Sequence, residues 1–186
     1  MIRKILQICG FALFSLPLMA ASPSVELDDK AVSRYVQSLD QMLPLLQAVD
    51  RSGQAWIEGL PEGVPGALYV GQVERGSDLF QQMNQRVQEH GFANVDQWAR
   101  IGDRILLTRL YIQEQEELDQ LYEHMDELEQ SLLNNTRQYS TAELEQIMRT
   151  FQDSKNHILM LVSTRGDVPW VQPHLAELNA ALSSFE

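Results

Sequence analysis

The feature that most constrains the fold of this chain is a long run without any helix-breaking residue. Between Asp103 and Ser140 the sequence contains neither glycine nor proline, the two residues that most often end or bend a helix. The run is rich in Gln, Glu and Leu, which favour helices. Asn94 can cap the first turn with its side-chain oxygen, and Gly91 suits the end of a preceding helix. The sequence therefore predicts one long helix over residues 95–133.

The apolar side of this predicted helix changes along its length. At about 100° per residue, the apolar residues of the first half lie in one sector and those of the second half lie roughly opposite. The first set is Trp98, Ile101, Ile105 and Ile112, and the second is Leu118, Leu121, Met125, Leu128 and Leu132. Either an unbroken rod packs first on one layer and then on another, or a break near Gln113–Glu117 resets the phase. We favour the unbroken rod.

Such a rod is too long for a compact domain of this size. At ~1.5 Å per residue it is about 60 Å long, whereas the globule is about 40 Å across. We therefore expect part of the helix to project beyond the rest of the protein.

The first twenty residues have the pattern of an export signal. Arg3 and Lys4 are followed by an apolar stretch from Ile5 to Leu18 and then by small residues. The stretch is short for a membrane span, which needs about 20 residues. We expect cleavage after Ala20, a periplasmic or secreted protein, and no stable membrane span after cleavage. A retained anchor is the alternative.

The remaining residues, 21–186, have the length of a single domain and contain no cysteine. Disulfides, thiol catalysis and thiolate metal sites are therefore excluded after cleavage. The whole chain has a formal charge of −12, so loss of Arg3 and Lys4 leaves −14. This acidity argues against nucleic acid as a partner.

Several shorter helices are predicted around the long one, and no segment alternates like a half-buried strand. Their start signals are an aspartate, a serine, a capping box and a proline. Between them lies a Gly/Pro-rich loop at 53–76, in which Leu68–Val73 fits a helical turn or a short strand equally well. The predicted fold is all-α, an irregular helical bundle of about five main helices around the central one. The additional helices run from Asp28 to about Asp50, Ser77 to about His90, Ser140 to about Val162, and onward from Pro173.

No catalytic or metal-binding pattern is present in the sequence. None of the four histidines has a second histidine at helical spacing, and no Glu-x-x-His pair occurs. Serine nucleophile elbows, phosphate-binding glycine loops and zincin helices are also missing. We therefore predict a protein that is not an enzyme and that has no cofactor.

Two groups of residues are candidates for binding. Trp56 adjoins the glycine-rich loop, and Trp98 and Arg109 share one sector of the long helix. Arg109 is unusual because a guanidinium on an apolar side needs a carboxylate or carbonyl partner. The second group, Glu116, Glu117 and Glu123, belongs to an acidic run with no Lys or Arg between Leu110 and Thr136. Each candidate also has a structural explanation: tryptophans at this spacing are core residues, and acidic runs are solvated helix faces.

Three segments resemble small exported all-helical proteins of proteobacteria with no assigned activity. They are His90-Gly91-Phe92 with Gln97-Trp98-Ala99, Gly102-Asp103-Arg104, and Trp170-Val171-Gln172-Pro173-His174-Leu175. The resemblance implies an all-helical periplasmic domain and no functional residues.

Two functions follow from these patterns. The first is a non-catalytic periplasmic protein that acts through surface contacts, as an adaptor or chaperone-like binder of an envelope protein or of a second copy of itself. The second is a carrier of a small ligand, anion or cation, with a groove between the 53–76 loop and the first half of the long helix.

Overall fold

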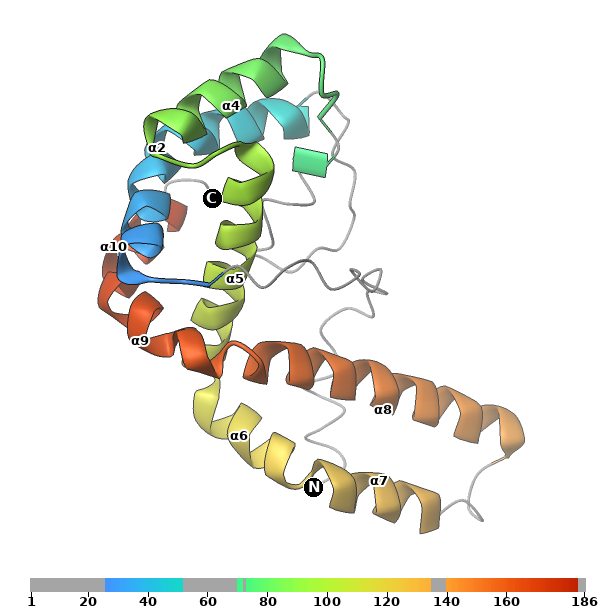
Figure 1. Ribbon diagram of the computed structural model, residues 1–186. Helices are drawn as coiled ribbons and strands as arrows, with labels where there is room; N and C mark the ends of the chain where they lie inside the picture. The colour runs from blue at the N-terminus through green and yellow to red at the C-terminus, as the bar shows by residue number, and fades with distance from the viewer. Residues whose placement is uncertain (1–25, 52–69, 72, 135–139, 184–186) are drawn as a thin grey trace.

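The computed structural model describes residues 26–51, 70–71, 73–134 and 140–183, and none of these residues lies in a strand. The all-α fold is thus confirmed (Figure 1). No helix in this part of the chain combines the length and apolarity needed to cross a membrane. The elements are α2 (Asp29–Arg51), α4 (Asp78–Glu89), α5 (Val95–Gln113), α6 (Gln115–Glu123), α7 (Met125–Asn134), α8 (Thr141–Val162), η2 (Arg165–Asp167), α9 (Val168–Val171), η3 (Gln172–His174) and α10 (Leu175–Ser183).

The helix starts follow the predicted capping residues. The side chains of Asp28 and Ser77 accept hydrogen bonds from backbone N–H groups three residues later, at 2.6 and 3.2 Å. Asn94 caps α5 in the same way, and Ser140 forms a complete capping box with Glu143. Gly91 has a φ of +80°, the left-handed conformation that lets α4 turn directly into α5.

The elements form a compact body and a projecting arm. In Figure 1, α2, α4, α5, α9 and α10 pack together, while α6, α7 and α8 extend away from them. We call the body the part built from α2, α4, α5, α9, α10 and the two short 3-10 helices. We call the arm the part built from α6, α7 and α8.

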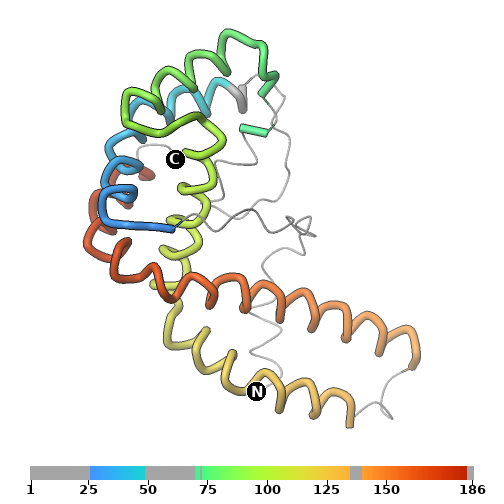
Figure 2. The backbone as a smooth tube through the Cα atoms, viewed as in Figure 1, coloured from blue at the N-terminus to red at the C-terminus, as the bar shows by residue number. Residues whose placement is uncertain are grey.

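The predicted unbroken helix over 95–133 is wrong, and the alternative of a break near Gln113–Glu117 is correct. The chain leaves helical geometry at Glu114 and again at His124, so three helices replace one. Figure 2 shows the change of direction between α5 and α6. The break has a physical reason: α5 buries its apolar side inside the body, and α6 must bury the opposite side against α8. A bend lets each half reach its own partner.

The body is centred on the crossing of α2 and α5. The rings of Tyr35 and Trp98 lie 5.1 Å apart, and both residues are buried. The indole N–H of Trp98 donates to the hydroxyl of Ser38 at 2.7 Å, which satisfies the buried donor. A Cβ at Gly102 would lie 2.5 Å from the Tyr35 ring. The absence of a side chain at Gly102 is thus what lets the two helices approach so closely.

Most of the 53–76 loop lies outside the described residues. Val70 and Gly71 are helical, which fits the helical alternative for that part of Leu68–Val73.

Candidate interaction surface

The arm is attached to the body by a small cluster of buried side chains at the elbow. Tyr111 at the end of α5, Leu118 on α6 and Leu161 on α8 are buried against one another. Leu107 and Leu110 of α5 pack on the same cluster. At this point α5 serves as a third helix beside α6 and α8, so the base of the arm has a covered core.

A polar network closes the elbow on its outer side. The Tyr111 hydroxyl donates to Asp119 Oδ1 at 2.7 Å and accepts from Arg165 Nε at 3.0 Å, and Arg165 also donates to Asp119. Partial desolvation raises the pKa of Asp119, but the bonds from Tyr111 and Arg165 lower it by more. The pKa of this carboxyl therefore lies below its ordinary value, so its ionised form is the one that the elbow holds.

A second ion pair fixes the segment that follows the arm. Arg104 on α5 binds both carboxylate oxygens of Asp167, whose side chain is only 7% exposed. A bidentate pair of this kind restricts orientation as well as distance. Residues 165–167 are thus held on α5, and the C-terminal end of α8 is held with them.

The two sides of the arm run in opposite directions. Arg165 contacts Asp119, and Lys155, ten residues before Arg165, contacts Glu129, ten residues after Asp119. The two sides of the arm are therefore antiparallel. The ammonium of Lys155 lies 2.6 Å from a Glu129 oxygen and 4.0 Å from Asp126. These contacts also show which sides of α7 and α8 face each other, and we call the line between these two sides the seam.

Five apolar residues of the arm lie to one side of this seam. At about 100° per residue, Leu128 and Leu132 lie about 60–100° from Glu129 on α7, and Ile147, Phe151 and Ile158 lie about 40–80° from Lys155 on α8. Because α7 and α8 are antiparallel, both displacements point to the same face, whereas the exposed Leu133 and Leu159 lie on the other side of the seam. We call these five residues, together with Leu121 of α6, the apolar arm face: Leu121, Leu128, Leu132, Ile147, Phe151 and Ile158.

The apolar arm face is only partly covered. All six of its residues are half-buried, and Met125 is the one fully buried residue among those described on α7. On α8 only Leu161, at the elbow, is fully buried. Each helix of a pair has only one neighbour along the pair, so a wide apolar stripe remains partly in water. The arm thus presents an apolar strip that begins at the covered elbow and continues to its distal end.

Many of the arm's side chains are acidic. Asp119, Asp126 and Glu129 pair with Arg165 or Lys155, whereas Arg149 pairs with Glu145 of its own helix. The other five acids of the acidic run are exposed glutamates that form no ion pair with any described residue: Glu114, Glu116, Glu117, Glu123 and Glu127. They include the three glutamates singled out in the sequence.

The tryptophan and arginine candidates lie elsewhere. Trp98 is fully buried in the body, and Arg109 Nε donates to the side-chain oxygen of Asn179 on α10 at 2.7 Å. Trp56 and most of its loop lie outside the described residues, so the proposed groove there stays a prediction. Trp170 is 42% exposed on α9.

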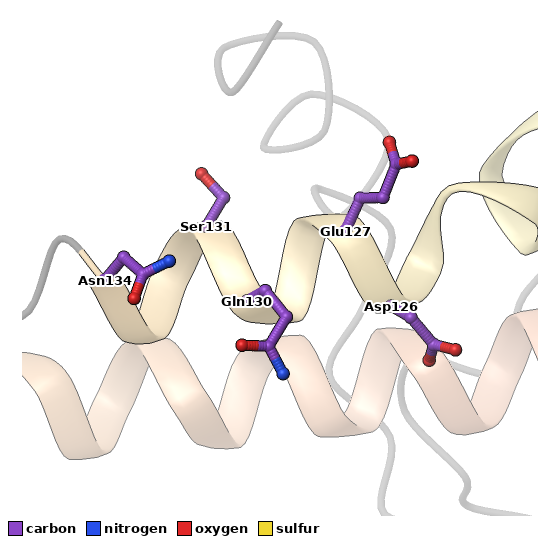
Figure 3. A pocket seen from close by; sticks show the side chains of 5 residues that line it. All are labelled: Asp126, Glu127, Gln130, Ser131 and Asn134. Carbon is purple, nitrogen blue, oxygen red and sulfur yellow. The ribbon is translucent and has the colours of Figure 1, made fainter.

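Figure 3 shows a shallow hollow on α7, lined by Asp126, Glu127, Gln130, Ser131 and Asn134. All five lining residues come from one helix, so the hollow has no opposite wall that would enclose a ligand. Within the described ranges, no three possible metal ligands come together.

Comparison with known proteins adds no relative. No family model, curated protein or solved structure matches the chain. The function must therefore be argued from the arm and the body themselves.

The sequence alone does not predict that the apolar arm face is a surface. The spacing of Leu121, Leu128 and Leu132 is typical of a side that packs on another helix. The pattern alone does not state how many helices cover that side, and this number decides whether it is core or surface.

Proposed function

We propose that this is a non-catalytic exported protein that works in the periplasm by binding another protein, as an adaptor or chaperone-like binder. The observation that carries the proposal is the half-buried apolar arm face, which extends away from a body that is already well packed. Large apolar strips with a polar rim are typical of protein-binding sites. The buried body then serves to hold the arm in place.

Site-specific photocrosslinking in cells that naturally produce the protein tests this role. A photoreactive residue is placed singly at Leu128 or Phe151 on the arm, and at Gln81 or Trp170 on the body as controls. We expect discrete crosslinked bands from the arm positions and none from the body positions. Equal crosslinking from all four positions, or none from the arm, would contradict the proposal.

The export step is tested separately. Intact-mass measurement of the protein released by osmotic shock should give a chain that begins at Ala21. A full-length chain that stays with the cell membranes would instead support the retained anchor.

A further inference from the structure

The partner of the arm can be specified further, and this step rests on the proposed function. We propose that the apolar arm face binds a basic amphipathic helix, which lies lengthwise along α7 and the N-terminal half of α8. The argument depends on three properties of the arm: its shape, its missing third layer and its charge.

The shape of the arm fits a helix. Two antiparallel helices present their apolar sides together on one face, and recognition of an amphipathic helix by such an apolar surface is a recurring binding mode. The side of the arm built from α6 and α7 runs from Gln115 to Asn134, which is roughly 30 Å at ~1.5 Å per residue. A ligand helix of about 20 residues has the same length.

The protein itself shows how the apolar side of the arm is covered at one end. At the elbow, Leu107, Leu110 and Tyr111 of α5 pack on Leu118 and Leu161, and Ile158 of the apolar arm face joins the same cluster. Distal to the elbow no described helix continues the third layer, and the residues of the apolar arm face are half-buried. A bound helix would extend the packing that α5 begins.

The charge of the arm decides what kind of helix can bind. Residues 111–136 contain eight acidic side chains and no Lys or Arg. Glu117 lies one turn before Leu121 on α6, and Glu143 lies one turn before Ile147 on α8, each about 40° from it, so both glutamates border the apolar arm face. A basic helix would be attracted by this rim, with a force that salt screens beyond about 8 Å at physiological ionic strength.

The same charge argues against a second copy as the occupant. Two arms that met face to face would bring two uninterrupted acidic runs together, and like charges at an interface disfavour the pairing. An anionic membrane surface is disfavoured for the same reason.

Synthetic peptides with matched compositions test the proposal. The probe is a peptide of about 20 residues with Leu at three- and four-residue spacing and Lys elsewhere. The controls are the same composition in scrambled order and the same Leu pattern with Glu in place of Lys. Affinity is measured by fluorescence anisotropy against the mature protein. We expect the patterned basic peptide to bind one to one, and at least about tenfold more tightly than either control.

Variants of the protein locate the binding. Leu132→Gln with Ile147→Gln should weaken the patterned peptide by at least about tenfold, whereas Trp170→Gln on the body should not change its affinity. Glu117→Gln with Glu127→Gln should weaken binding and reduce its salt dependence. The matched control, Asp40→Asn with Glu74→Gln, removes two exposed acids from the body and should not. Circular dichroism checks that each variant keeps the helical content of the parent.

Each contrary outcome points to a different occupant. Equal binding of the scrambled peptide, or unchanged binding in the arm variants, would overturn the proposal. A dimer that light scattering detects and that Leu132→Gln dissociates would assign the face to a second copy. Arm-dependent binding to vesicles of phosphatidylethanolamine and phosphatidylglycerol would assign it to a membrane. If the photocrosslinks at Leu128 and Phe151 appear but the basic peptide has no preference, the binding role stands and only the class of partner is wrong.

Discussion

Replacing Gly102 by alanine should destabilise the body, although alanine favours a helix more than glycine does. Two effects compete at this position. Alanine gains about 1 kcal/mol of helix propensity. The new Cβ would lie only 2.5 Å from Cε2 and the hydroxyl oxygen of Tyr35 and 2.6 Å from its Cζ, and the buried ring stacks on Trp98. Overpacking of this kind costs about 1–3 kcal/mol.

The clash is severe enough that we take the upper end of this range, which leaves a net loss of about 2 kcal/mol. For a domain of this length that corresponds to a fall in Tm of about 4–8 °C. Urea unfolding followed by circular dichroism measures the free energy, and differential scanning calorimetry measures Tm.

The same substitution in a protein that lacks the Tyr35 ring tests this explanation, because the change in stability should then have the opposite sign. Leucine at position 35 would lack Cε2, Cζ and the hydroxyl oxygen, the three atoms that Gly102→Ala would meet. In a Tyr35→Leu protein the same Gly102→Ala change should therefore stabilise by up to about 1 kcal/mol, the propensity gain alone. If Gly102→Ala has the same sign in both backgrounds, the close approach of α2 and α5 at this point is not what requires glycine.

Three further predictions concern the elbow and the arm. The folded-state pKa of Asp119 is lowered, so its contribution to stability is present above the ordinary carboxyl pKa of about 3.9 and is lost as pH falls through the lower folded value. In urea unfolding, Asp119→Asn should therefore be less stable than the parent at neutral pH, and this difference should vanish in strong acid. A difference that stays constant with pH would contradict the prediction. Lys155→Met should speed amide hydrogen exchange in α7 while leaving α4 unchanged, since Lys155 bridges the two strands of the arm; equal rates in parent and variant would mean that this contact does not hold α7. Ser140→Ala removes a complete capping box and should destabilise α8 by about 1 kcal/mol. Amide hydrogen exchange in the first turns of α8 should therefore become faster, whereas Ser183→Ala should have no such effect.

The local structure was predictable because its causes are local. Asp28, Ser77, Asn94 and Ser140 cap helices through side-chain oxygens that reach amides three residues away, and Gly91 adopts a conformation that other residues avoid. These effects need no knowledge of the rest of the chain. The swap of the apolar side along 95–133 was also visible, and it correctly marked 113–117 as a point where the helix can break.

The choice between a rod and a bend was not predictable from these signals. Glu114 is neither glycine nor proline, so propensity favours continuity across it. The bend is instead favoured by the packing of α8 beside α6, which brings Leu118 against Leu161 and places Asp119 within reach of Arg165. The pairs Arg104–Asp167 and Arg109–Asn179 could not be predicted from the sequence either, because their members are 63 and 70 residues apart and meet only in the folded protein.

The bend also explains why the apolar arm face lies on the arm and not on the body. Had the helix continued straight beyond residue 113, its second apolar side would have pointed away from the body with no partner of its own. By bending, the chain gives that side α8 as a neighbour and seals the elbow with Tyr111 and Leu161. One neighbour satisfies only part of a wide apolar stripe, and α5 ends where the arm begins. The apolar side that the body could not absorb is therefore presented at the end of a fixed arm, where one further helix would complete its packing.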